Sequence, residues 1–110
     1  MNRKIERIES EILNILNHTL IHDIYDEYIK KVSFTAVHLT SDLSTAYVYV
    51  DTYDRSEIDQ KIDKLMIAKS VFKNAMAKAM QIRKIPDLKF LKDETIDNSL
   101  KIDKILDKIK

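Results

Sequence analysis

Apolar side chains recur at steps of three and four residues over the first part of the chain, and charged residues lie between them. This spacing places the apolar side chains on one face of a helix. Asn2, just before the pattern starts, is a residue type that caps helix N-termini. The pattern predicts an amphipathic helix over residues 3–21 whose buried stripe is Ile5, Ile8, Ile12, Ile15, Leu16 and Leu20.

Two runs of β-branched and aromatic residues follow, over residues 32–40 and 45–53. Both have the composition of strands. A mixed segment, residues 22–31, separates the first run from the predicted helix, and we interpret it as a loop. Residues 41–44, Ser-Asp-Leu-Ser, have turn chemistry, although the turn contains no glycine. Two strands joined by a short turn predict a β-hairpin.

The second run alternates with a period of two residues, which is the period of a strand with one buried face. Ala46, Val48 and Val50 share one face, and Tyr47 and Tyr49 share the other. We expect the alanine and the valines to face the core. The tyrosines either stack on nucleobases or pack against neighbouring side chains, and the sequence leaves both interpretations open.

A second helical pattern runs from Ile58 to Ile82, and Ser56 is placed to cap its start. We expect Pro86 to end it, because the residue before a proline is disfavoured in a helix. One straight helix of this length would reach roughly 40 Å, whereas a compact domain of this size has a radius of gyration of about 13 Å. Two successive three-residue steps in the apolar stripe end at Ala68, and we therefore predict a bend there.

The last part of the chain predicts one strand and a tail. Residues 87–91 have the pattern of a strand, residues 93–98 have turn and capping chemistry, and apolar residues then recur at helical spacing. The chain is long enough to build one core. We assign residues 1–92 to a single domain and residues 93–110 to a C-terminal tail that is helical or partly disordered. The order of elements predicts an α+β fold.

Composition excludes several classes of protein. The 110 residues include no cysteine, which excludes disulfides, thiolate nucleophiles and cysteine-based zinc sites. They include no glycine, which the loops that cradle phosphates require. No apolar run approaches the roughly 20 residues that span a membrane, and the N-terminus has no apolar signal segment. We therefore expect a soluble, cytoplasmic protein without a membrane partner.

The formal net charge of +1 conceals a strong internal polarity. Residues 40–60 contain one arginine and five acids, a net charge of −4, whereas residues 61–84 contain seven basic residues and one aspartate, a net charge of +6. On one helix, Lys69, Lys73 and Lys84 would share a side. Such a stripe suits a phosphate backbone, and its binding would weaken as salt rises. The alternative is that these lysines only solvate an exposed helix face.

Three segments together carry a family resemblance. Residues 40–50 read Thr-Ser-Asp-Leu-Ser-Thr-Ala-Tyr-Val-Tyr-Val, residues 80–90 read Met-Gln-Ile-Arg-Lys-Ile-Pro-Asp-Leu-Lys-Phe, and residues 93–96 read Asp-Glu-Thr-Ile. With these motifs at this separation, the chain resembles the bacterial ribosome-binding factor A family over nearly its whole length. The resemblance implies an α+β fold similar to type II KH domains, in the order α-β-β-α-kink-α-β, with helices on one face of a three-stranded mixed sheet.

In that family an alanine-x-glycine kink joins the two helices, and the matching residues here are Ala68, Lys69 and Ser70. Serine replaces the glycine, and we expect its hydroxyl to cap the second helix. The family implies a non-enzymatic, monomeric factor without a cofactor, which binds the immature small ribosomal subunit and its ribosomal RNA and assists late maturation of the subunit. The RNA-binding residues that the resemblance and the charge pattern favour are Lys69, Lys73, Lys78, Arg83, Lys84, Arg3 and Arg7.

Two histidines, His18 and His22, have the i, i+4 spacing of metal ligands on one helix face. A third ligand would have to be Asp23, Asp26 or the distant His38. The glutamate of a zinc-protease motif is missing, because threonine follows His18. We interpret the pair as solvent-facing residues near the end of a helix and expect no metal.

Acidic residues gather before the second helical pattern, where negative charge stabilises the start of a helix. Catalysis by such carboxylates needs burial and a cleft, and we expect no enzyme here. The alternative function is a KH-like protein-interaction module without direct RNA contact, which would use Tyr47 and Tyr49 on the open face of the sheet. The acidic residues are Asp51, Asp54, Glu57 and Asp59.

Overall fold

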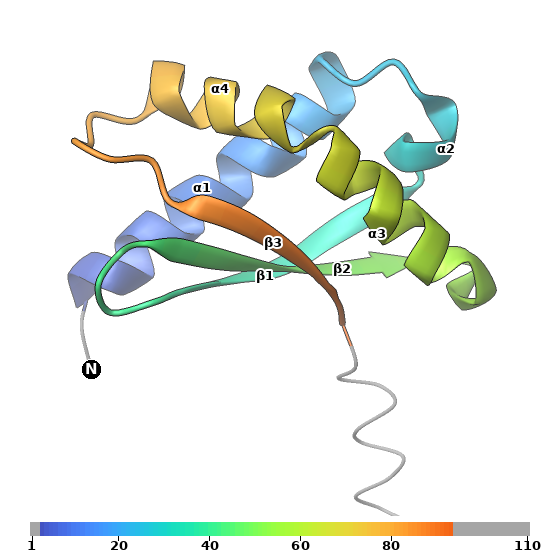
Figure 1. The fold of residues 1–110 in the computed structure, drawn as a ribbon, viewed down its shortest axis with the longest axis horizontal. Helices are drawn as coiled ribbons and strands as arrows, with labels where there is room; N and C mark the ends of the chain where they lie inside the picture. Colours follow the sequence, from blue (N-terminus) through green and yellow to red (C-terminus); the bar gives the residue numbers. More distant parts are fainter. Residues whose placement is uncertain (1–2, 94–110) are drawn as a thin grey trace, which may run out of the picture.

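The computed structural model describes residues 3–93 of the chain. The elements are α1 (Arg3–His22), α2 (Glu27–Lys30), β1 (Val32–Leu39), β2 (Thr45–Thr52), the 3₁₀ turn η1 (Arg55–Glu57), α3 (Ile58–Ile67), α4 (Lys69–Ala79) and β3 (Asp87–Lys92). The strands form one sheet in the order β1-β2-β3, with β1 and β2 antiparallel and β2 and β3 parallel. The helices lie on one side of this sheet (Figure 1).

The architecture confirms the predicted α+β fold with a helix, a hairpin, two helices joined at a kink and a third strand. The parallel pairing of β2 and β3 follows from the connection between them, because only a crossover through helices returns the chain in the same direction. The tail predicted after Asp93 lies outside the described residues.

The core forms between the helices and the covered face of the sheet. Ala46, Val48 and Val50 are fully buried, as their alternation predicts. Phe34 on β1, Phe72 on α4 and Phe90 on β3 meet in a cluster whose ring centroids are 5.6–5.8 Å apart. Such contacts between aromatic rings add about 0.5–1.5 kcal/mol per pair beyond the burial of their area. This cluster fixes α4 over the middle of the sheet.

The bend predicted at Ala68 is confirmed. α3 ends at Ile67 and α4 begins at Lys69, while Ala68 between them has φ −83° and ψ 5°. The Ala68 carbonyl accepts a hydrogen bond from the Val71 N–H at 3.0 Å, so the two helices share a tight junction. The predicted capping role of Ser70 is wrong, because Ser70 lies inside α4 and no side chain caps this helix. Nor does the junction require glycine, since no residue in it has a positive φ.

Two predicted helix boundaries are also wrong. The second helix of the pair ends at Ala79, well before Pro86, and Met80 is already extended with φ −104° and ψ 139°. Met80 is buried in the core, and the gain from burying it there ends the helix earlier than the apolar pattern indicates. At the start of the pair, Ser56 is not the cap. The Asp54 carboxylate instead accepts a hydrogen bond from the Ser56 N–H and starts η1.

The segment interpreted as a loop, residues 22–31, contains the short helix α2. The Asp26 carboxylate accepts a hydrogen bond from the Tyr28 N–H at 2.9 Å and so caps it. Ile29 of this helix is buried, which attaches α2 to the core. Within residues 3–93, none of the helices combines the length and the apolar character needed to cross a membrane.

Candidate nucleic-acid interface

Asp87 forms ion pairs with two of the lysines in the basic stretch, residues 61–84. The Nζ atoms of Lys69 and Lys73, one turn apart on α4, lie 3.2 Å and 3.4 Å from the same Oδ1 of Asp87 at the start of β3. Partial burial acts to raise the pKa of Asp87, but the hydrogen bonds from the two ammonium groups outweigh it and hold the pKa below 3.8. An acid from outside residues 61–84 therefore balances part of their charge.

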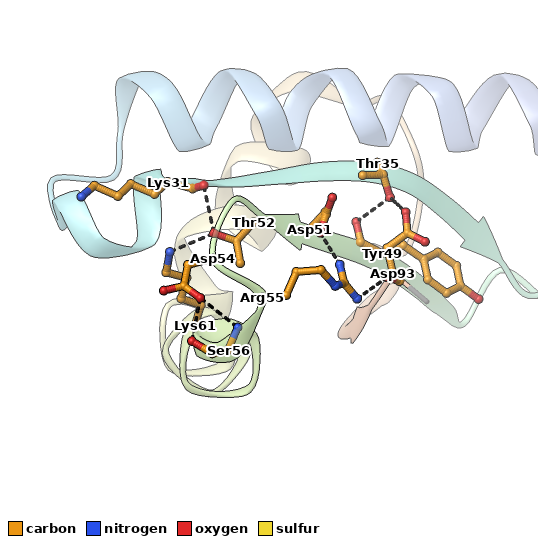
Figure 2. A network of polar contacts seen from close by, with 10 residues as sticks. All are labelled: Lys31, Thr35, Tyr49, Asp51, Thr52, Asp54, Arg55, Ser56, Lys61 and Asp93. Atoms are coloured by element: carbon orange, nitrogen blue, oxygen red, sulfur yellow. Dashed lines mark hydrogen bonds and ion pairs between the residues drawn. The ribbon is translucent and has the colours of Figure 1, made fainter. Parts of the chain in front are cut away.

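Lys61 and Lys64 on α3 serve the fold. Lys61 is only 3% exposed, and its ammonium donates a hydrogen bond to Oγ1 of Thr52 at 2.9 Å. Figure 2 shows this contact at the end of β2. The Nζ atoms of both lysines lie over the ring of Tyr28, 4.9 Å and 5.2 Å from its centroid, which is cation–π geometry. Lys64 also lies 3.9 Å from Asp26, so neither lysine is a free cation.

The remaining cations of the stretch are Lys78, Arg83 and Lys84. All three are exposed, and none makes a side-chain hydrogen bond or ion pair within residues 3–93. Lys78 lies in the last turn of α4, next to a groove between α4 and α1. Arg83 and Lys84 lie in the connection from α4 to β3, so the expectation that Lys84 shares a helix side with Lys73 is wrong. The predicted stripe of Lys69, Lys73 and Lys84 is therefore not continuous. Lys69 and Lys73 on α4 pair with Asp87, whereas Lys84 is exposed in the loop before β3.

The loop that carries Arg83 and Lys84 lies at the hairpin end of the sheet. Figure 1 shows this loop, the hairpin turn and the start of α1 at the same end of the molecule. Arg3 and Arg7 are exposed on the first turns of α1. Lys4, which the sequence did not single out, lines a cavity together with Arg83 and Lys84. In the sequence, only its position next to Arg3 could have marked Lys4 as a candidate binding residue.

The hairpin turn itself is held by the carboxylate of Asp42. This group accepts hydrogen bonds from the hydroxyls of Thr40 and Ser44, at 2.7 Å and 2.8 Å, and from the Ser44 N–H at 3.1 Å. These bonds, that from Thr40 above all, lower the pKa of Asp42 to about 2. Leu43 has φ 63°, the conformation that a glycine usually supplies, at a cost of about 1–2 kcal/mol. The Asp42 bonds maintain this conformation.

Comparison of the sequence with models of known protein families identifies the family of this chain. The model of the family described as "Ribosome-binding factor A" matches residues 4–106. The chain belongs to this family. The ribosome-binding factor A of Mycoplasma pneumoniae is 37% identical to it over 107 residues, which cover 97% of this chain and 92% of that protein. The family match confirms the family membership that the three sequence motifs predict.

Solved structures of family members have the same fold. The crystal structure of ribosome-binding factor A from Thermus thermophilus superposes with a TM-score of 0.76 at 23% identity, over 83% of this chain and 97% of that one. A homology model of the Thermus thermophilus factor, fitted into a cryo-electron microscopy map of a 30S complex, superposes with a TM-score of 0.65 at 23% identity, over 79% and 92%. The type II KH-like arrangement expected of the family is therefore present here.

In this member of the family, the acids before α3 have structural partners. Asp51 pairs with Arg55, whose Nη2 also donates to the Asp93 carbonyl at 2.8 Å (Figure 2). Hydrogen bonds from the hydroxyl and the N–H of Ser56 lower the pKa of Asp54. These contacts join the end of β2, η1 and the end of β3. The acidic cluster thus fastens the end of the sheet that lies away from the hairpin.

His18 of the histidine pair lines the same groove as Lys78, whereas the two tyrosines lie on β2. The rings of His18 and His22 lie 4.2 Å apart, and residues 3–93 contain no group of three metal-binding side chains around them or elsewhere. Tyr47 and Tyr49 are half-buried on the face of the sheet away from the helices. Tyr49 pairs with Leu91 of β3, which is 39% exposed. This face of the sheet is therefore partly apolar.

Proposed function

We propose that the chain binds the small ribosomal subunit in the cytoplasm, contacts its ribosomal RNA and assists late maturation of the subunit without catalysing a reaction. The family match over residues 4–106 carries this proposal. The 30S complex described for the Thermus thermophilus factor names the partner of a relative with the same fold. We assign the binding to residues 1–92 and treat residues 93–110 as a separate tail.

The distribution of free charge supports contact with RNA. Lys78, Arg83 and Lys84 are exposed and lack acidic partners in the described part of the chain. Arg3 and Arg7 are exposed at the start of α1, at the same end of the molecule as the loop that holds Arg83 and Lys84 (Figure 1). When exposed basic side chains without acidic partners bind RNA phosphates, they release the counterions condensed on the phosphate backbone. This release gives affinity without sequence specificity. Lys69 and Lys73 contribute less to this contact, because Asp87 already neutralises part of their charge.

Sedimentation tests the proposal directly. Purified chain is mixed with immature small subunits at low salt and run through a sucrose gradient. We expect it to move with the subunits, and to be released when salt is raised from about 50 to about 200 mM. A chain that stays at the top of the gradient at low salt would count against the proposal. A variant with Arg83→Gln and Lys84→Gln should bind more weakly than one with Lys31→Gln and Lys89→Gln, which loses the same charge elsewhere.

A second candidate is a protein-interaction module that uses the open face of the sheet. The exposure of Leu91 beside Tyr49 favours it, since apolar side chains on a sheet face gain from being covered. The substitution Leu91→Ser separates the two functions. If it abolishes sedimentation with the subunit while the Arg83 and Lys84 variant sediments as wild type, the contact is made to a ribosomal protein and not to RNA.

A further inference from the structure

A cavity of about 430 Å³ opens at the hairpin end of the sheet, where three segments distant in the sequence meet. The start of α1, the hairpin turn and the loop before β3 each contribute to its wall. Its volume lies within the range of about 300–1,000 Å³ that pockets for small ligands occupy. The lining residues are Lys4, Ile8, Leu39, Asp42, Leu43, Gln81, Ile82, Arg83, Lys84 and Pro86.

The polar part of this wall suits an anion. It holds three cations, Lys4, Arg83 and Lys84, and one acid, Asp42. The carboxylate of Asp42 already accepts three hydrogen bonds from Thr40 and Ser44 in the turn. Arg83 and Lys84 make no side-chain ion pair with any described residue, so both are free to receive a phosphate. Arginine in particular presents a planar fork that matches phosphate oxygens.

The apolar part of the wall suits a flat ring. Leu43 and Ile82, both half-buried, contribute carbon surface beside the two free cations, and the fully buried Pro86 backs this wall. Leu43 is held there in the left-handed conformation, and backbone held in such a region is found preferentially at ligand sites. A nucleotide combines the two chemistries, an anionic phosphate and an aromatic base. The face of the base is accessible to a wall of this kind only when the base is unpaired.

We infer that this cavity binds one unpaired nucleotide of single-stranded RNA, with its phosphate between Arg83 and Lys84 and its base against Leu43 and Ile82. The inference rests on the proposed function and names the kind of RNA that this part of the chain receives. It differs from a general basic surface in one respect: the base contributes to the binding as well as the phosphate.

Fluorescence anisotropy with labelled single-stranded RNA of about eight nucleotides tests the inference. We expect Arg83→Gln with Lys84→Gln to lower the affinity about tenfold or more, since each loses a hydrogen bond to a charged group. The matched control is Lys31→Gln with Lys89→Gln. Lys31 precedes β1 at the opposite end of the sheet and Lys89 lies on β3, and both are exposed. Thermal melts of both variants check that they fold.

The ligand supplies a second arm that does not depend on protein variants. The same RNA without bases at its central positions should bind the wild-type chain about tenfold more weakly. For the variant with Arg83→Gln and Lys84→Gln, we expect RNA without the central bases and intact RNA to bind equally weakly. We expect blunt duplex RNA to bind less tightly than the single strand, and adenosine monophosphate not to displace the single strand at comparable concentration.

Several results would overturn the inference. They are an equal loss of affinity in the control variant, no effect of removing the bases, equal binding of duplex RNA, or displacement by the mononucleotide, which would make the cavity a site for free nucleotides. Absence of any binding to short single-stranded RNA would also overturn it. That outcome leaves the proposed function standing if the chain still sediments with small subunits, and the two failures are therefore distinguishable.

Discussion

The carboxylate of Asp87 holds the ammonium group of Lys69 at 3.2 Å, Oδ1 to Nζ, across the junction between α4 and β3. The same oxygen receives Lys73 at 3.4 Å. Asp87 belongs to β3 and the lysines to α4, so the contact forms only in the folded chain. It turns two residues that the sequence presents as free cations into one partly neutralised cluster.

Asp87→Asn should therefore strengthen RNA binding. The substitution removes the negative charge from the cluster. It also breaks the ion pairs of Lys69 and Lys73 with Asp87, which are worth about 0.2–1 kcal/mol each. We expect the affinity for ribosomal RNA fragments to rise about two- to fivefold, and the salt dependence to become steeper. Filter binding over a series of salt concentrations measures both.

Asp63→Asn is the matched control for this prediction. Asp63 is an exposed acid on α3, and it makes no ion pair with the described residues. If both substitutions raised the affinity equally, the effect would reflect net charge alone, and Asp87 would have no special role in restraining Lys69 and Lys73.

Thr52→Val should destabilise the fold by about 1–3 kcal/mol, because it leaves the buried ammonium of Lys61 without its acceptor at 2.9 Å. Urea unfolding gives the free energy. Thr52→Ser keeps the hydroxyl and removes one methyl group, and we expect it to cost clearly less. Unchanged stability in Thr52→Val, with a loss only in Thr52→Ser, would mean that the methyl group matters and the contact with Lys61 does not.

Asp42 should titrate near pH 2, well below the ordinary 3.8. Because the pKa is lowered in the folded chain, the contribution of this carboxylate to the turn is complete above pH 3.8 and is lost as the pH falls from 3.8 towards about 2. Carbon-13 NMR of the carboxyl group measures the midpoint. In Thr40→Val, which removes the hydroxyl that lowers the pKa most, the midpoint should move back towards 3.8. A wild-type midpoint at or above 3.8 would refute the assignment.

Ser70→Gly restores the residue that the family pattern places at the kink, and we nevertheless expect it to destabilise the chain by about 0.5 kcal/mol. Ser70 lies inside α4 with a negative φ, so glycine brings only extra freedom in the unfolded chain. Ser70→Ala should stabilise by a similar amount, and chemical denaturation compares the three. A more stable glycine variant would show that the junction is strained.

Much of the fold was predictable because burial imprints its period on the sequence. The alternation of Ala46, Val48 and Val50 reports directly which face of β2 is covered. The shortened steps that end at Ala68 report a change in helix direction. Both signals follow the local period of the backbone, two residues in a strand and about 3.6 in a helix, and burial of one face makes that period visible in the sequence.

The end of α4 and the state of the cations were not predictable in the same way. Ala79 and Ile82 continue the apolar stripe, yet the helix stops because burial of Met80 favours an extended chain there. Lys73 lies next to Asp87 only because β3 returns beside α4. A charge count along the sequence treats each lysine alike, whereas ion pairs between distant segments decide which of them can bind a partner.

The most direct test of RNA binding at the hairpin end is crosslinking of the chain to ribosomal RNA in its complex with the small subunit, with the linked residues located by mass spectrometry. We predict crosslinks on the segment that holds Arg83 and Lys84 and on the start of α1 around Lys4, each joined to unpaired nucleotides. Crosslinks confined to the open face of the sheet around Tyr49 and Leu91, or links to ribosomal protein alone, would contradict it.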